Sequence, residues 1–306
     1  MSAISLHGVG KSYDGAIWAV RTVSFSVGPG ETVALVGHNG AGKTTCMKMM
    51  LGLIRPSEGT LSVLGENPAS GDFAARRRIG FLPENVSFNN ALTGVETMRF
   101  YSELKGLAAG EIEPALRLVG LDGDSGKRVG SYSKGMRQRL GLAQALIGRP
   151  EVLMLDEPTA GLDPALRQRF YEILDTLREG GTAILLSSHA LTELEERAGR
   201  VVVMNRGMLV ADGSLDELRR LARLPSVIRI RVDDEKDGKP AEVMRSFGPV
   251  ESPAPGVWSV KASPGDKVRV VDRIMRAGLA VSDIDVVPPT LDELYAHFLR
   301  SGEGAA

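Results

Sequence analysis

A glycine-rich segment at residues 37–44 has the residue types and spacing of a loop that holds phosphate groups. It reads Gly-His-Asn-Gly-Ala-Gly-Lys-Thr and fits the pattern G-x-x-x-x-G-K-[ST]. Glycines let successive backbone N–H groups face a phosphate, and a helix that starts at the loop favours anions. Lys43 would reach the β- and γ-phosphates, and Thr44 would offer a hydroxyl to Mg²⁺. A chance glycine-rich turn is disfavoured, because an apolar run precedes the segment and helical spacing follows it.

Two acidic residues, Asp156 and Glu157, directly follow the apolar run at residues 152–155. Such a run is typical of a buried strand, so the two carboxylates would stand at its end. Beside the phosphate loop, Asp156 would bind Mg²⁺ directly or through water, and Glu157 would orient and polarise an attacking water. The competing interpretation is an acidic strand end that faces solvent. It loses weight because the same chain contains the phosphate loop.

Alternating strands and helices must position these residues. Short strands broken by Gly and Pro fill residues 2–36, and buried strands are predicted at 151–158 and 182–189. An amphipathic helix is predicted at 164–179, and helical patterning runs through 92–148 with breaks near 106–110 and 121–133. This alternation predicts an α/β fold around a parallel sheet.

The hydrophobic pattern changes near residues 221–225. We therefore predict one domain over residues 1–221, with a helical part at about 85–150, and a small α+β domain over 222–306. Strand-like segments in the second part alternate with helices near 240–247 and 265–277. A βαββαβ order, as in ferredoxin-like folds, fits that pattern.

Composition narrows the class of protein. The chain has 306 residues, of which 43% are hydrophobic and 25% charged, as in ordinary globular proteins. The net charge of −1 gives no electrostatic footprint for nucleic acid. Cys46 is the one cysteine, which leaves no disulfide framework and favours a reducing compartment. No run of about 18 apolar residues occurs, so the sequence predicts no membrane-spanning helix.

Further motifs resemble those of ABC transporter ATP-binding subunits. Residues 132–136, Tyr-Ser-Lys-Gly-Met, are similar to the family signature LSGGQ, and residues 159–163 are similar to its D-loop. His189 stands where the family has its switch histidine, and Tyr13 where an aromatic ring stacks on adenine. With the phosphate loop and the two acids, six motifs occur in order over about residues 3–215. The resemblance implies a P-loop NTPase fold of the ABC type, with a RecA-like core, an N-terminal antiparallel β subdomain and a helical subdomain.

The resemblance also implies ATP and Mg²⁺ as cofactors and hydrolysis of ATP to ADP and phosphate. It implies catalytic roles for Lys43, Glu157 and His189, and metal contacts for Thr44, Glu84 and Asp156. The nucleotide contacts that it implies are Tyr13, Gly37, Asn39, Gly40, Ala41, Gly42, Lys43, Thr44, Thr45, Glu84, Ser133, Gly135 and Asp163.

Two copies would form a homodimer with ATP at the interface, as the resemblance implies. Ser133 and the backbone N–H of Gly135 would contact the γ-phosphate held by the other copy, and Asp163 would communicate across the dimer. The implied partner is a polytopic membrane permease, which places the chain peripherally on the cytoplasmic face of the inner membrane. Nucleic acid is not an expected partner.

Three positions depart from the family pattern. Lys134 and Met136 replace a glycine and the glutamine of the signature, but the backbone donor of Gly135 is kept. Glu84 stands where most members have glutamine. Its carboxylate can still ligate Mg²⁺ or a water, although it adds negative charge near the phosphates.

Residues 84–105 lie where the family docks its membrane partner. Apolar side chains there are either surface anchors for the permease or core of the helical subdomain, and both interpretations stay open: Phe88, Leu92, Met98, Phe100 and Tyr101.

The narrower resemblance is to ATPases of ABC-2 type exporters. The segments GHNGAGKTT and LPENVSF are similar to those of the ATPase that helps mature the copper sites of nitrous-oxide reductase. The alternative is a non-transport ABC ATPase acting on a macromolecular complex. Ribosome-associated factors usually carry two ATPase halves, and DNA-repair clamps carry a long coiled coil before the signature, and this chain has neither pattern.

Other candidate sites favour structural interpretations. Cys46, Met47, Met49 and Met50 are soft metal-ligand types, but they follow the phosphate loop on a predicted helix and fit core packing better. The basic run at 76–78 fits a solvated helix face, and the four histidines lack zinc spacing. The apolar face of the last predicted helix would pack on its own domain or on a second copy.

Overall fold

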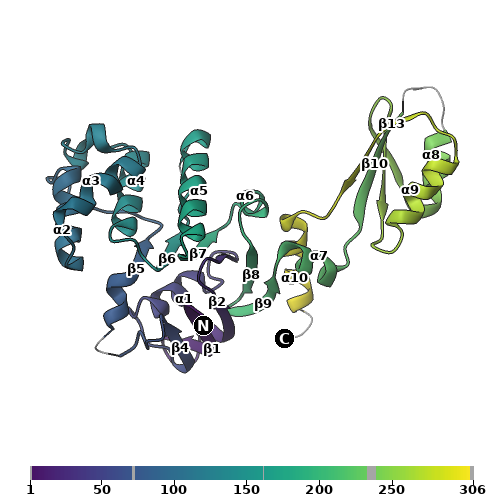
Figure 1. Cartoon of the computed structure of the whole chain (residues 1–306). Coiled ribbons are helices and arrows are strands. Elements are labelled where there is room, and N and C mark those ends of the chain that lie inside the picture. Colours follow the sequence, from purple (N-terminus) through teal and green to yellow (C-terminus); the bar gives the residue numbers. More distant parts are fainter. Residues whose placement is uncertain (1, 71–72, 161, 233–238, 304–306) are drawn as a thin grey trace. The chain divides into compact units, whose positions relative to one another are not determined.

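The computed structural model describes residues 2–70, 73–160, 162–232 and 239–303. The chain forms two compact units, Met1–Gly213 and Ser214–Ala306 (Figure 1). The sequence-based boundary at 221/222 differs from this division by one short helix, α7 (Leu215–Ala222). This helix belongs to the second unit because it packs against α10 (Leu291–Glu303) there.

A six-stranded sheet forms the centre of the first unit, in the order β5-β6-β7-β3-β8-β9. The first five strands are parallel and β9 is antiparallel to β8. Their bounds are Ile79–Leu82 (β5), Val152–Asp156 (β6), Ala183–Ser188 (β7), Thr32–Val36 (β3), Arg200–Asn205 (β8) and Met208–Gly213 (β9). Every residue of β3, β6 and β7 is buried, which explains their nearly continuous apolar runs. The predicted α/β class is confirmed.

A smaller antiparallel sheet, in the order β2-β1-β4, packs on the other side of α1 (Lys43–Met50). Its strands are Ile4–Ser12 (β1), Trp18–Val27 (β2) and Glu58–Val63 (β4). Cys46, Met47, Met49 and Met50 of α1 lie in the core with these strands, each no more than 1% exposed. Burial raises the pKa of the Cys46 thiol to about 12. The predicted core packing of this cluster is confirmed.

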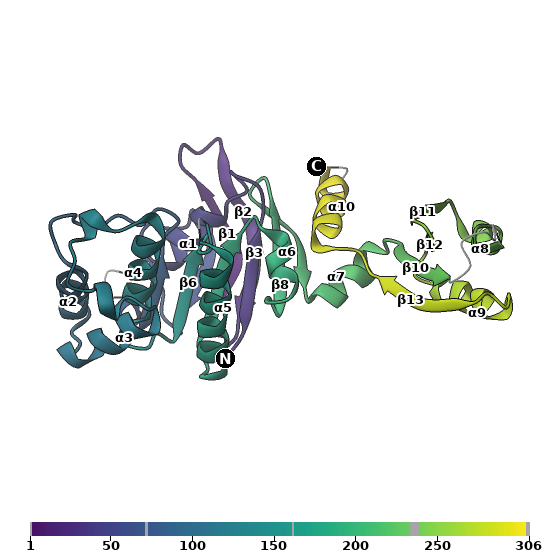
Figure 2. The ribbon, with the colours of Figure 1, turned by 90° about the horizontal axis from the view of Figure 1, so that it is seen from above.

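Helices α2 (Gly94–Lys105), α3 (Ile112–Leu118) and α4 (Lys134–Leu146) gather beyond the β5–β6 edge of the large sheet (Figure 2). Short 3₁₀ turns separate them, at Ala109–Glu111, Asp122–Asp124 and Val129–Ser131. These turns fall near the two predicted breaks. A capping box between Thr93 and Glu96 starts α2 and supplies its first free N–H groups with acceptors. Another 3₁₀ turn, Ala74–Arg78, precedes β5. Helices α5 (Pro164–Glu179) and α6 (Leu191–Glu195) follow β6 and β7.

The second unit contains a four-stranded antiparallel sheet in the order β11-β12-β10-β13. Its strands are Ser226–Val232 (β10), Val250–Ala254 (β11), Val257–Ala262 (β12) and Val281–Val287 (β13). Helix α8 (Lys239–Met244), with the 3₁₀ turn Arg245–Phe247, and helix α9 (Lys267–Arg276) complete a βαββαβ order. Leu291 and Leu294 of α10 are fully buried, so this helix packs within its own unit.

Across the residues described here, no helix combines the length and apolar character that crossing a bilayer requires.

Candidate functional site

The glycine-rich segment forms a loop between β3 and α1, as predicted. Residues 38–45 of this loop, together with Ala19, line a cavity of about 350 Å³. Gly42 has a φ of 104°, and a side chain there would also place its Cβ 2.7 Å from the Ala19 carbonyl oxygen. A Cβ at Gly37 would lie 2.7 Å from the carbonyl oxygen of Met204. Both glycines are therefore required by the backbone path, and the loop leaves room for phosphate groups.

Lys43 lies under this loop, 7% exposed, at the first turn of α1. Its ammonium donates hydrogen bonds to the carbonyl oxygens of Gly37 and, at 3.3 Å, His38. Burial lowers the pKa of Lys43, and the nearby carboxylates of Glu157, Asp156 and Glu84 oppose that shift. The ammonium is thus placed where phosphate oxygens could replace its backbone acceptors.

Asp156 lies beside the loop because β7 pairs with both β6 and β3, so that the carboxyl ends of the three strands meet at one edge. The Thr44 hydroxyl donates to Asp156 Oδ2 at 3.0 Å, and the Ser187 hydroxyl donates to Asp156 Oδ1 at 2.5 Å. Asp156 is 5% exposed. A carboxylate and a hydroxyl at this spacing are the hard oxygen ligands that Mg²⁺ prefers.

Glu157 has an unusual backbone, with a φ of 49° in the left-handed region. Its N–H donates to the carbonyl oxygen and to the side-chain oxygen of Ser187, at 3.2 and 3.1 Å. Its carboxylate accepts from the backbone N–H of His189 at 3.3 Å and lies 2.7 Å from His189 Nδ1. The Glu157 side chain is 12% exposed, whereas that of His189 is 75% exposed. A carboxylate held in this way can orient a water molecule.

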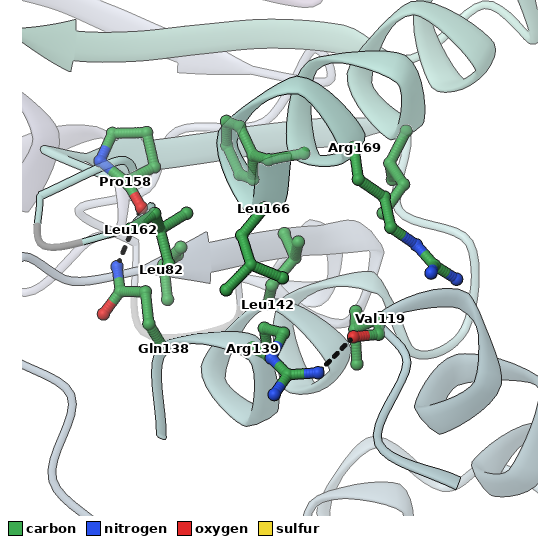
Figure 3. A pocket seen from close by; sticks show the side chains of 11 residues that line it. Leu82, Val119, Gln138, Arg139, Leu142, Pro158, Leu162, Leu166 and Arg169 are labelled. Atoms are coloured by element: carbon green, nitrogen blue, oxygen red, sulfur yellow. Dashed lines mark hydrogen bonds between the residues drawn. The ribbon is translucent and has the colours of Figure 1, made fainter. Parts of the chain in front are cut away.

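The residue after Glu157 is tied to the helical subdomain. Figure 3 shows Gln138 of α4 pointing at Pro158, and its amide Nε2 donates to the Pro158 carbonyl oxygen at 3.1 Å. Leu82, Leu142 and Leu166 surround this contact in a small, mostly apolar pocket. Helix α4 begins with the signature-like residues, so one buried hydrogen bond connects that helix to the segment that carries Glu157.

The other predicted residues lie on separate elements. Glu84 follows β5, is exposed, and acts electrostatically on Lys43. Ser133 caps α4 by accepting from Met136 N–H at 3.2 Å, and Asp163 caps α5 by accepting from Leu166 N–H at 2.9 Å. Tyr13 is 64% exposed in the loop after β1, with the Lys11 ammonium 5.4 Å from its ring centroid.

Ser133, Gly135, Asp163 and Tyr13 are not among the described residues that line the phosphate-loop cavity. Within one copy the structure therefore brings together the loop, Asp156, Glu157, His189 and, through its charge, Glu84.

Ser187 and Gln138 were not predicted from the sequence. Ser187 is one of two buried serines that end the strand at 183–188, and Gln138 is a buried polar residue on a helix. Buried polar side chains need partners, so their types in buried segments were the available signal.

Comparison with known proteins shows the family. The ABC transporter family model matches residues 20–160. The ABC transporter ATP-binding protein YxlF of Bacillus subtilis is 37% identical over 284 residues, which cover 90% of this chain and 93% of that protein. The chain belongs to the ABC transporter ATP-binding subunits. The bacitracin transport ATP-binding protein BcrA of Enterococcus faecalis is 33% identical over 296 residues, or 94% of each chain.

Solved structures agree with this assignment. An ATP-binding subunit of an ABC transporter has a TM-score of 0.68 at 32% identity and covers 72% of this chain and 93% of its own. A bacterial ABC transporter cassette solved as a dimer, MJ0796, has a TM-score of 0.65 at 23% identity and supports the fold. The predicted fold type, the predicted cofactors ATP and Mg²⁺, and the predicted ATP hydrolase activity of this ABC ATP-binding subunit are confirmed.

Proposed function

We propose that this chain is the ATP-hydrolysing subunit of an exporter and that it works as a homodimer on a membrane permease. The observation that carries the proposal is a continuous set of polar contacts at one sheet edge, from Thr44 through Asp156, Ser187 and Glu157 to His189. It joins a metal-binding pair to a water-orienting carboxylate, next to the phosphate loop. ATP hydrolysis needs these three parts within reach of one triphosphate.

In this proposal, the loop amides and Lys43 hold the β- and γ-phosphates. Thr44 and Asp156 bind Mg²⁺, Glu84 reaches the metal or a water bound to it, and Tyr13 stacks on adenine. The remaining contacts to the nucleotide come from Gly37, Asn39, Gly40, Ala41, Gly42 and Thr45. If the Thr44 hydroxyl turned from Asp156 towards the metal, Asp156 Oδ1 would still accept the hydrogen bond from the Ser187 hydroxyl.

Glu157 would orient and polarise the attacking water in this proposal, and His189 would hydrogen-bond the γ-phosphate and hold the same water. The 2.7 Å contact between His189 Nδ1 and the Glu157 carboxylate supports this pairing. Because His189 is largely exposed, its ring can turn towards a phosphate that enters the cavity.

The second copy supplies the other half of each nucleotide site. Ser133 and Gly135 stand at the exposed N-terminal end of α4, a helix of 13 residues whose dipole favours the γ-phosphate. Asp163 would communicate between the two copies across the same dimer interface. ATP then stabilises the dimer, and hydrolysis weakens it by removing contacts that both copies share.

The permease would dock on an aromatic cluster of the helical subdomain. Phe100 is 52% exposed and Leu104 63% exposed on α2, and Tyr101 packs edge-to-face against both Phe88 and Phe100. Met98 is fully buried and belongs to the core instead. Partly exposed aromatic rings are typical anchors of protein interfaces.

Export is supported by the relatives. Besides the bacitracin transport protein, a Nod factor export ATP-binding protein of Burkholderia thailandensis is 39% identical over 218 residues, or 70% of this chain and 71% of that protein. Service to the copper sites of nitrous-oxide reductase stays a prediction that rests on the residues of two segments alone. A deletion strain whose nitrous-oxide reductase keeps its full copper content would overturn it.

Glu157→Gln tests the proposed chemistry. It keeps the shape of the side chain but removes the charge that polarises water, so we expect ATP to bind and the chain to elute as a dimer during size-exclusion chromatography with Mg-ATP. The exposed Glu172→Gln on α5 is the matched control and should behave as wild type. A variant at position 157 that hydrolyses ATP at the wild-type rate, or stays monomeric with ATP, contradicts the proposal.

The partner is tested by co-expression with the membrane protein encoded beside this chain. We expect the two to co-purify and ATP turnover to rise. Substitution of Phe100 and Leu104 by Ser should abolish co-purification while leaving the basal ATPase rate of the isolated subunit unchanged. If the two proteins still co-purify after the double substitution, Phe100 and Leu104 are not part of the interface.

A further inference from the structure

The second unit contains a cavity of about 450 Å³, separate from the ATP site. Four basic side chains line it: Arg219, Arg220 and Arg223 from the end of α7, and Lys267 from the start of α9. None of the described residues that line it is acidic. The cavity is large enough for a small organic molecule, and its charge favours an anion.

The positive charge of this cavity is only partly compensated. Arg219 Nη1 lies 3.4 Å from the Asp216 carboxylate, and its Nε donates to the Pro289 carbonyl oxygen at 3.1 Å. Arg220 donates to a backbone carbonyl, that of Asp216. Within the described ranges, no carboxylate forms an ion pair with Arg220, Arg223 or Lys267.

Asp266, the acid next to Lys267, is paired with Arg269 at 2.8 Å. Counting charges around the cavity therefore leaves a net positive site.

A buried hydroxyl without a partner lies in the same wall. Ser226, the first residue of β10, lines the cavity and is 1% exposed. Its Oγ is buried and forms no hydrogen bond within the part of the chain that the structure describes. Burying a hydroxyl without a hydrogen-bond partner is unfavourable, so a residue of this kind points to a ligand.

The start of α9 adds free donors to this wall. This ten-residue helix begins at Lys267, and no side-chain cap is present at its N-cap residue, Asp266. The backbone N–H groups of a first helical turn need acceptors from outside the helix, and an anion supplies them.

The rest of the wall is apolar. Leu224, Pro264, Gly265, Pro288 and Pro289 complete the lining. A site with cations and donors on one side and rigid apolar side chains on the other fits a molecule with a phosphate group and an organic body.

We propose that this cavity binds a phosphate group carried by a small organic molecule or a lipid. The phosphate would contact the guanidinium groups of Arg220 and Arg223, the Ser226 hydroxyl and the first turn of α9. This site is independent of the ATP site, so its test does not depend on hydrolysis. An ordinary solvated basic surface would explain the arginines but not the buried Ser226 hydroxyl.

Calorimetric titration of the full chain with inorganic pyrophosphate tests the site, in a Lys43→Ala background that removes phosphate binding at the ATP site. We expect one molecule of pyrophosphate per chain. The double substitution Arg220→Gln and Arg223→Gln should weaken binding by at least about tenfold, because each removes a charge-assisted hydrogen bond. Arg229→Gln with Arg231→Gln is the matched control, since Arg229 and Arg231 are exposed on β10 and outside the lining.

Ser226→Ala separates a ligand contact from a packing feature. We expect it to weaken pyrophosphate binding by about tenfold and, without pyrophosphate, to leave the melting temperature unchanged or higher, because a buried unpartnered hydroxyl is gone. Unchanged pyrophosphate affinity in this variant would overturn the proposal. So would an equal loss of pyrophosphate affinity in the Arg220/Arg223 variant and in the Arg229/Arg231 control.

Co-sedimentation distinguishes the two sources of phosphate. Vesicles of phosphatidylcholine with phosphatidylglycerol should capture the chain through the two arginines if the source is a lipid headgroup, and vesicles of phosphatidylcholine alone should not. Pyrophosphate binding without capture by vesicles assigns the site to a soluble molecule. If the chain neither binds pyrophosphate nor is captured by vesicles, the site is refuted.

Discussion

Ser187→Ala is the sharpest test of how the fold positions the site. The Ser187 hydroxyl donates to Asp156 Oδ1 and accepts from the backbone N–H of Glu157, and Ser187 is fully buried. Hydrogen bonds to charged groups contribute about 1.5–3 kcal/mol. We therefore expect the first unit to lose about 2 kcal/mol of unfolding free energy, which lowers its melting temperature by roughly 4–8 °C.

The same substitution should change the response to magnesium. Without the Ser187 hydroxyl, the Asp156 carboxylate can turn, and the oxygen proposed to face Mg²⁺ is no longer fixed. If about 1.4 kcal/mol of the lost bond is felt by the bound metal, the Mg²⁺ concentration for half-maximal ATPase activity rises about tenfold. Steady-state phosphate release across a Mg²⁺ series measures this shift.

Ser188→Ala is the matched control for this experiment. Ser188 is its neighbour on β7, 2% exposed, and its hydroxyl accepts from the backbone N–H of Ala190 rather than touching Asp156. This control should lose stability but keep the wild-type Mg²⁺ response. If Ser187→Ala also keeps the wild-type response and rate, the hydroxyl does not position Asp156 and the reasoning fails.

Three further predictions concern other contacts. Lys43→Ala should abolish ATP binding, and unchanged affinity for a fluorescent nucleotide would contradict the phosphate-loop assignment. Gln138→Leu removes the bond to the Pro158 carbonyl oxygen, so kcat should fall about five- to tenfold with KM unchanged, and a change confined to KM would argue against positioning. Arg200→Met breaks the paired 2.6 Å hydrogen bonds to Asp212, so urea unfolding should show a loss of about 2 kcal/mol, and an unchanged midpoint would make that pair dispensable.

The arrangement of the candidate site was predictable from the sequence where its parts are local. The conformation of the loop at 37–44 follows from its local sequence, because the glycine positions and the start of the helix are set by consecutive residues. Asp156 and Glu157 were predictable because an apolar run ends in two acids. Their approach to the loop follows from the order of parallel strands.

Contacts between distant segments were not predictable in the same way. Gln138 and Pro158 meet only because α4 packs against β5, the strand paired with β6, and no spacing rule connects the two residues. The same limit explains the domain boundary. Helix α7 has an amphipathic pattern that fits either unit, and its burial against α10, about seventy residues later, decides its place. Met98 is similar, because a helical apolar residue is compatible with core or interface until its neighbours are known.

The left-handed backbone at Glu157 has a consequence for the evolution of this chain. A residue with a side chain is disfavoured by about 1–2 kcal/mol in that conformation, whereas glycine is not. Laboratory selection for heat resistance alone would therefore enrich glycine at position 157 and yield proteins that are more thermostable but lack ATPase activity. Persistence of glutamate under such selection would indicate that the strand end tolerates the side chain without penalty.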